Sequence, residues 1–251
     1  MSFKFACIVA CAPFIAAAAG LDDLKPAPEG ANRLTADEKA EGWSLLWDGT
    51  STNAWVSKKD LKTFPDRGWV MKDGWLGMKK KGGGGDLVTV EKYRDFIFAF
   101  DFQLTKGANS GVKYYFDENQ NGGTCEEYQV LDNAHPDSKR GKDGNRKCAS
   151  LYDLIPAKAD KILQGPGEWN SGRIVAQGKT VEHWLNGKKV LVYTRGSEDF
   201  RTRVAASKYA KQGKDAKGEP QPWGEIPEGR LLLQDHGDSY AAFCNLKVKK
   251  L

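Results

Sequence analysis

The sequence lacks the short motifs that identify several catalytic classes directly. Its three histidines include no HExxH zinc pair, and the glycine-rich stretch KKKGGGGD (79–86) lacks the G-x-x-x-x-G-K-[ST] order of a phosphate-binding loop. No E-x-D-x-E run offers the paired carboxylates that retaining glycosidases hold about 5–5.5 Å apart. The net charge of +5 comes without an RNP, zinc-finger or recognition-helix pattern. We therefore expect no nucleic-acid partner and no conventional two-carboxylate hydrolysis.

Cysteine is also scarce beyond the first twenty residues, where it occurs only at Cys125, Cys148 and Cys244. We expect Cys125 and Cys148 each to begin a strand. In a simple antiparallel hairpin they would then lie at opposite ends, too far apart for the Cα separation of about 5.5 Å that a disulfide needs. The sequence favours free thiols and leaves the pairing open.

Long apolar runs are confined to the N-terminus. Lys4 precedes an apolar run that starts at Phe5, and small residues follow at 16–19, which is typical of a cleaved signal peptide over residues 1–20. The run is short for a membrane span. A lipobox-like IVAC ending at Cys11 offers a lipoprotein as the alternative, but the apolar run continues past that cysteine. We predict a secreted or periplasmic protein without a membrane span.

Glycine and tryptophan are abundant, with 28 Gly and eight Trp in 251 residues. Short alternating segments follow one another at near-regular spacing, and Asp73-Gly74 and Asn186-Gly187 are two-residue hairpin signals between such segments. This pattern predicts an all-β antiparallel sandwich or jelly roll.

The organisation along the chain is simple. A leader at 21–40 precedes one domain at 41–251, in which the segment 150–155 is expected to be a strand. One short helix near 198–211 opens a longer loop, and together they occupy 198–228. That segment suits either a lid over a cleft or an interaction surface in a larger assembly.

Polar side chains gather on one face of several predicted strands, because alternate residues of a strand point the same way. Glu127 and Gln129 share a face, and so do Gln234 and His236. A third series on one face consists of Asn109, Lys113 and Tyr115. A solvent-facing sheet surface would explain any single strand. Carboxylates, amides and histidine beside tryptophan are instead typical of a surface that holds a sugar.

The three histidines differ in their settings. His236 ends a strand and is the best general base by residue type, because its ordinary pKa lies near neutrality. We expect His183 to be packed or at a hairpin edge and His135 to be exposed in a loop. Glu127, Asp132 and His236 could together hold a divalent metal, although no compact ligand spacing supports this.

Six blocks of sequence, in order, carry a resemblance to a known family. They are WSLLWDGTSTNAW, GANSGVKYYF, EYQVLD, SLYDL, GEWNSGRIVAQGKTVEHWLNG and GRLLLQDHGD, and the match runs from about Trp43 to Leu251. The series resembles the 3-keto-disaccharide hydrolase family. The resemblance implies a concanavalin-like jelly roll, export, and cleavage of glycosides already oxidised at C3 of the sugar. In FCNLKV, Cys244 stands where the family usually has arginine, which puts any substrate contact at that position in doubt.

The implied chemistry needs no pair of carboxylates, because a ketone at C3 acidifies the proton at C2. A base removes that proton, the C1–O bond breaks by elimination, and water adds to the intermediate. We assign the base and acid roles to His236 and Glu127. The residues expected to bind substrate are Gln129, Gln234, Asn109, Asp132, Asp235 and Tyr152. Hydrogen bonding at a hairpin end is the alternative for Asp132 and Tyr152.

Two further questions stay open at this level. A non-catalytic carbohydrate-binding module on the same fold would present the same polar and aromatic face without needing His236. The sequence also does not fix the disaccharide, the metal requirement or the oligomeric state.

Overall fold

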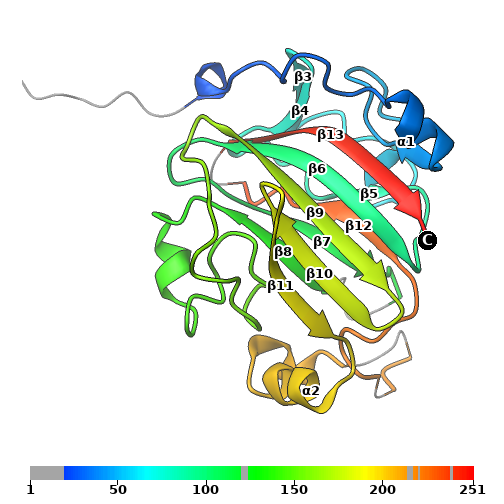
Figure 1. The fold of residues 1–251 in the computed structure, drawn as a ribbon, viewed down its shortest axis with the longest axis vertical. Coiled ribbons are helices and arrows are strands. Elements are labelled where there is room, and N and C mark those ends of the chain that lie inside the picture. The colour runs from blue at the N-terminus through cyan, green and yellow to red at the C-terminus, as the bar shows by residue number, and fades with distance from the viewer. Residues whose placement is uncertain (1–19, 120–123, 214–216, 220, 238–239) are drawn as a thin grey trace, which may run out of the picture.

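The computed structural model describes residues 20–119, 124–213, 217–219, 221–237 and 240–251, and these form two antiparallel sheets stacked face to face (Figure 1). The predicted signal peptide lies outside the described residues and stays a prediction. The sandwich confirms the predicted all-β, concanavalin-like jelly-roll class. Of the described helices, none is long and apolar enough to span a bilayer.

The described strands divide into a large and a small sheet. In spatial order the large sheet contains β11 (Lys188–Thr194), β10 (Thr180–Leu185), β9 (Trp169–Gln177), β6 (Phe96–Leu104), β13 (Ala241–Lys250), β4 (Trp75–Met78) and β3 (Trp69–Lys72), with β1 (Trp43–Leu45) also pairing with β13. The small sheet contains β2 (Trp55–Ser57), β5 (Leu87–Thr89), β12 (Arg230–Leu233), β7 (Asn109–Phe116) and β8 (Glu126–Leu131).

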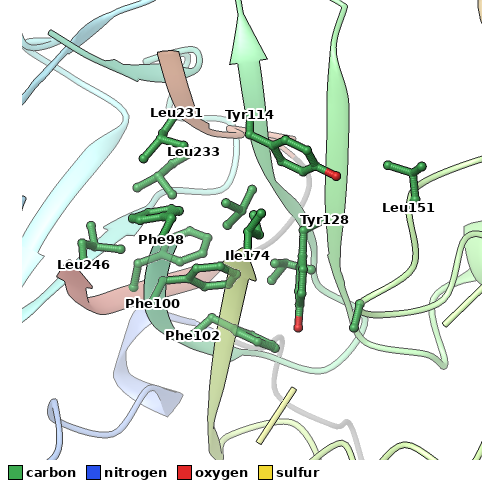
Figure 2. Close-up of a cluster of buried hydrophobic side chains, with 14 of the residues drawn as sticks. Phe98, Phe100, Phe102, Tyr114, Tyr128, Leu151, Ile174, Leu231, Leu233 and Leu246 are labelled. Carbon is green, nitrogen blue, oxygen red and sulfur yellow. The ribbon is translucent and has the colours of Figure 1, made fainter. Parts of the chain in front are cut away.

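The hydrophobic core lies between the two sheets. Alternate residues of β6 (Phe98, Phe100 and Phe102) point inward from the large sheet, and Tyr128 and Leu233 meet them from the small sheet (Figure 2). The ring centroids of Phe100 and Tyr128 are 5.2 Å apart in an edge-to-face arrangement. Because one face of each strand is buried here, the register of the small sheet fixes which side chains point outward.

Short helices complete the fold. They are η1 (Leu21–Asp23), α1 (Ala36–Ala40), η2 (Pro136–Lys139), α2 (Glu198–Ala205) and η3 (Lys208–Lys211). Ser197 caps α2 by accepting a hydrogen bond from the Phe200 amide, and η3 follows within three residues of the end of α2. This matches the helix predicted near 198–211.

Local turn chemistry explains where sequence and structure agree. Both predicted hairpins form, with Asp73 at φ 48° and Asn186 at φ 48°, each followed by glycine at positive φ. Asparagine, aspartate and glycine tolerate the left-handed backbone that these two-residue turns require. The hairpin predictions are confirmed.

Two strand predictions are wrong for a common reason, an unforeseen left-handed residue. Segment 150–155 is a tight turn, with Asp153 at φ 64° and the Ile155 amide bonded to the Leu151 carbonyl. Cys148 therefore does not begin a strand, although the three cysteines of the described chain are free and buried. Tyr115, at φ 58°, turns into the core instead of sharing a face with Lys113.

The leader packs on the outer face of the large sheet. Leu24 is buried there against Trp75 and Cys244. Asn32 and Asn245 exchange two hydrogen bonds, each backbone amide donating to the other's side-chain oxygen at 2.7 and 2.9 Å. Position 244 is therefore covered by the leader on the side of the sandwich that carries no predicted site residue.

Candidate functional site

A cavity of about 250 Å³ opens on the outer face of the small sheet. Strands β7 and β8 and the chain just after β12 line it, together with Lys208, Tyr209 and Gln212 from the segment that contains η3. Six residues predicted from the sequence meet in it. They are Glu127, Gln129, Asn109, Gln234, His236 and Tyr152.

Strand register explains how the floor is assembled. In the β7–β8 pair, Lys113 lies opposite Glu127, and Gly111 lies opposite Gln129. Tyr128 and Val130, the intervening residues of β8, are fully buried in the core. Alternation therefore turns Glu127 and Gln129 away from the core and into the cavity.

Glu127 is held in place by its two neighbours on β7. A Cβ atom at position 111 would come within 2.3 Å of Glu127 Oε1, so the carboxylate occupies space that only glycine leaves free. Lys113 Nζ lies 3.5 Å from Glu127 Oε2. Burial of Lys113 disfavours its charged form, but Glu127, Cys125 and Asp86 together outweigh this and raise the pKa of Lys113. The two groups form a largely buried ion pair on the cavity floor.

The side-chain amides of Gln129 and Asn109 are hydrogen-bonded to each other in the same cavity. Gln129 Nε2 donates to Asn109 Oδ1 at 3.2 Å. Gln129 Oε1 is buried without a hydrogen-bond partner among the described residues. A buried acceptor without a partner is costly, so it favours a ligand that brings a hydroxyl donor.

Tyr152 contributes its ring rather than its hydroxyl. The hydroxyl donates to Asp137 Oδ2 at 2.9 Å, and Asp137 also accepts from Arg146 at 2.9 Å. On the cavity side, the Lys208 ammonium lies 4.1 Å from the centre of the Tyr152 ring. The Tyr152 hydroxyl therefore bonds to Asp137, while its ring contacts Lys208 in the cavity.

The histidines occupy three different environments. His236 lines the cavity, with its ring centroid 6.4 Å from that of His135. His135 is partly buried, not exposed as predicted, because its Nδ1 accepts the Asp137 amide at the start of η2. His183 is fully buried between the sheets, as the packed interpretation predicted.

Two predicted substrate-binding residues lie outside the cavity. Asp132 accepts the Gly107 amide at 2.7 Å and the Ala134 amide at 3.0 Å, which fits its alternative interpretation as a hairpin-end residue. Asp235 accepts the Gly85 amide at 2.9 Å, and burial raises its pKa. Both carboxylates organise turns at the edge of the sheet instead of lining the pocket.

Comparisons with known proteins decide the family. Residues 42–249 match the family model of the 3-keto-alpha-glucoside-1,2-lyase-like domain. The chain belongs to that family. It is also 35% identical to a 3-keto-disaccharide hydrolase of Bacteroides thetaiotaomicron, over 91% of this chain and 84% of that protein. The resemblance seen in the sequence motifs is thereby confirmed.

Solved structures of the family's fold agree with this assignment. A candidate glycosyl hydrolase from Parabacteroides distasonis is 32% identical with a TM-score of 0.73, covering 88% of this chain and 99% of that one. A second such protein from the same organism is 29% identical with a TM-score of 0.59, covering 83% of this chain and 99% of that one. Family membership supports activity as a hydrolase on glycosidic bonds.

Sequence reasoning missed half of the cavity wall of this family member. The lining residues that it did not assign to the site are Lys113, Thr124, Cys125, Lys208, Tyr209 and Gln212. Lys113 carried a signal, because it shares a strand face with Asn109. Lys208, Tyr209 and Gln212 carried none, because only the fold brings their segment over β8.

The metal site considered from the sequence is not supported by a cluster of ligands in the described residues. Among the residues that the structure describes, no group of three or more His, Cys, Asp and Glu side chains is placed to hold an ion. Asp132 lies outside the cavity that contains Glu127 and His236, so the three proposed ligands do not form a site.

Proposed function

We propose that this protein hydrolyses glycosides whose sugar carries a ketone at C3, by elimination followed by addition of water. One observation carries the proposal: among the described residues that line the cavity, Glu127 is the single carboxylate, and it shares the cavity with His236 and several amides. Direct displacement at C1 by a retaining or inverting route uses two carboxylates. A substrate with an acidified C2 proton can be cleaved by one base and one acid.

The reaction balances with the groups in the cavity. Glu127 takes the C2 proton, and the electron pair moves to the C3 oxygen to give an enolate. The enolate returns to a ketone as a C1=C2 double bond forms and the C1–O bond breaks, with His236 giving a proton to the leaving oxygen. Water then adds its hydroxyl at C1 and gives its other proton to His236, while Glu127 returns its proton to C2, so the net change is hydrolysis and both residues are restored.

The geometry of the site supports these roles. Lys113 faces Glu127 Oε2, which leaves Oε1 to accept a proton. Gln129 Oε1 is an acceptor for a sugar hydroxyl, and Asn109 and Gln234 lie on the same surface. The similarity to a protein named 3-keto-disaccharide hydrolase supports the same substrate class here.

Turnover of a 3-keto-glucoside, measured beside its unoxidised parent, tests the proposal. We expect aglycone release from the keto sugar alone, with exchange of the C2 hydrogen in D₂O. Glu127→Gln should lower kcat by about 10²–10⁴-fold, the usual contribution of a positioned base, whereas Glu168→Gln, at a half-exposed carboxylate, should not change it.

Other outcomes would identify a different protein. Binding of both sugars without cleavage of either would indicate a carbohydrate-binding module. Near-normal turnover by His236→Ala would remove His236 from the mechanism. Loss of activity with a chelator, restored by a divalent ion, would require a metal in addition to these residues.

A further inference from the structure

The cavity carries more positive charge than its carboxylate balances. Among its described lining residues, Lys113 and Lys208 are cationic and Glu127 is anionic, so these three groups together carry a charge of +1. Lys113 lies opposite Glu127 in the sheet and 3.5 Å from it, so these two charges offset each other. The remaining charge is that of Lys208.

Aromatic rings, rather than a carboxylate, surround the Lys208 ammonium. Its nitrogen lies 4.1 Å from the centre of the Tyr152 ring and 5.1 Å from that of Tyr209. Lys208 forms no ion pair with any residue that the structure describes. The residue is exposed on its outer side, yet desolvation at the ammonium lowers the pKa of Lys208. Such a cation gains from an anion that forms in the cavity.

In the reaction proposed above, the negative charge of Glu127 passes to a neutral sugar as Glu127 takes up the C2 proton. That charge develops on the C3 oxygen when C2 loses its proton, and it disappears when the C1–O bond breaks. Glu127 and Asp153 favour the charged form of Lys208 without forming an ion pair with it. A cation that forms no direct ion pair in the ground state matches this intermediate better than it matches the substrate, which is the requirement for lowering the barrier.

We propose that Lys208 is a catalytic residue whose ammonium stabilises the enolate oxygen at C3. This inference rests on the proposed function. The ammonium donates a hydrogen bond to the oxygen while Glu127 holds the C2 proton, and no bond to Lys208 forms or breaks. Tyr152 and Tyr209 position the ammonium. The segment carrying α2 and η3 is thereby an essential wall of the active site and not an accessory lid.

Lys208→Met tests the assignment against Lys211→Met, an exposed lysine on the same short helix. With a 3-keto-glucoside we expect Lys208→Met to lower kcat by about 100-fold, the usual effect of removing one oxyanion donor, with KM changed less than about threefold. The rate of C2 hydrogen exchange should fall in parallel. Lys211→Met should match the wild-type protein, and Lys208→Arg should recover part of the loss.

A second variant keeps the test independent of folding. In Lys208→Ala, ethylammonium added to the solution should restore part of kcat, which a merely misfolded protein would not show. Unchanged kcat in Lys208→Met, or a loss confined to KM, would overturn the assignment, since the latter means that Lys208 binds the ground state. If the wild-type protein does not cleave the keto sugar at all, the proposed function fails first, and that result is visible without any variant.

Discussion

Glu127 lies over a glycine because the side chain of any other residue at position 111 would occupy the place of its carboxylate. The carboxylate packs against the bare backbone of Gly111 and forms an ion pair with Lys113. The position of the carboxylate therefore depends on two residues of the neighbouring strand β7. Two adjacent strands with a different register would have kept the same residue types and lost the site.

Gly111→Ala should lower activity without unfolding the protein. The new methyl group displaces the Glu127 carboxylate, and a misplacement of about 1 Å can cost roughly 100-fold in rate. We expect kcat for a 3-keto-glucoside to fall by about that factor, with an unchanged far-UV circular dichroism spectrum. Gly165→Ala is the control, because a Cβ atom there would meet no neighbour within 4 Å. Full activity in Gly111→Ala would show that Glu127 tolerates the shift.

At the scale of elements, the segment of α2 and η3 is attached to the sandwich by stacked aromatic rings. Tyr193 of β11 stacks on Phe200 of α2 with centroids 5.5 Å apart, Phe200 stacks on Trp223, and Trp223 stacks on Tyr209 of η3 at 4.1 Å. Trp223 Nε1 also donates to Thr124 Oγ1 at 3.2 Å, beside the start of β8. This stack positions the cavity wall.

Trp223→Ala should loosen that wall while leaving the two sheets intact. Removing the central ring of the stack should raise KM for the keto sugar about tenfold and speed amide hydrogen exchange in residues 208–213, since a region with fewer buried contacts opens at lower cost. Trp223→Phe keeps a ring in the stack and should retain most of the activity. Equal exchange rates in the wild-type and Trp223→Ala proteins would contradict this account.

Turns that depend on adjacent residues could be predicted from the sequence, whereas turns that depend on contacts with distant residues could not. The Asn186-Gly187 turn depends on two adjacent residues, so its chemistry is legible in the sequence. The turn at Ala149 and Asp153 contains no Asn-Gly or Asp-Gly pair, and Arg146 stabilises it by bonding to both Asp153 and Asp137. Such tertiary support overrides local strand preference.

The same limit applies to the site. Alternation within single strands correctly brought Glu127, Gln129 and Gln234 to one surface. It could not separate Asp132, which serves a turn, from residues that reach the cavity. It also could not find Lys208, because Lys208 is about eighty residues from Glu127 in the sequence and only the complete fold brings both residues to one cavity.

At the scale of the whole molecule, a buried polar chain joins the two sheets. His183 of β10 contacts Tyr114 of β7 through its Nε2 at 2.9 Å, and Tyr114 contacts the Tyr193 hydroxyl at 2.9 Å. His183 Nδ1 lies 3.0 Å from the Ala149 carbonyl, which can only accept, so Nδ1 carries the proton. Burial lowers the pKa of His183 from 6.5 to about 4.

Because His183 is buried in this series of hydrogen bonds, the free energy of unfolding depends on pH between about 4 and 6.5. The unfolded protein binds a proton at His183 below about pH 6.5, whereas the folded protein does so only near pH 4, so stability falls as the pH drops through that interval. The contribution lost is about 3 kcal/mol. Urea unfolding at pH 7 to pH 4 should therefore show a steeper decline for the wild-type protein than for His183→Asn. Parallel declines would assign the acid sensitivity to other groups.

The leader's position has a consequence for how the molecule can be attached to a surface. Residues 24–32 cross the large sheet, on the side of the sandwich that faces away from the cavity. A surface attached to the chain ahead of residue 20 would lie on the side of the large sheet, and the cavity on the small sheet would face the surrounding medium. Immobilisation through the amino end should then preserve access for large glycosides, without a spacer to reorient the enzyme.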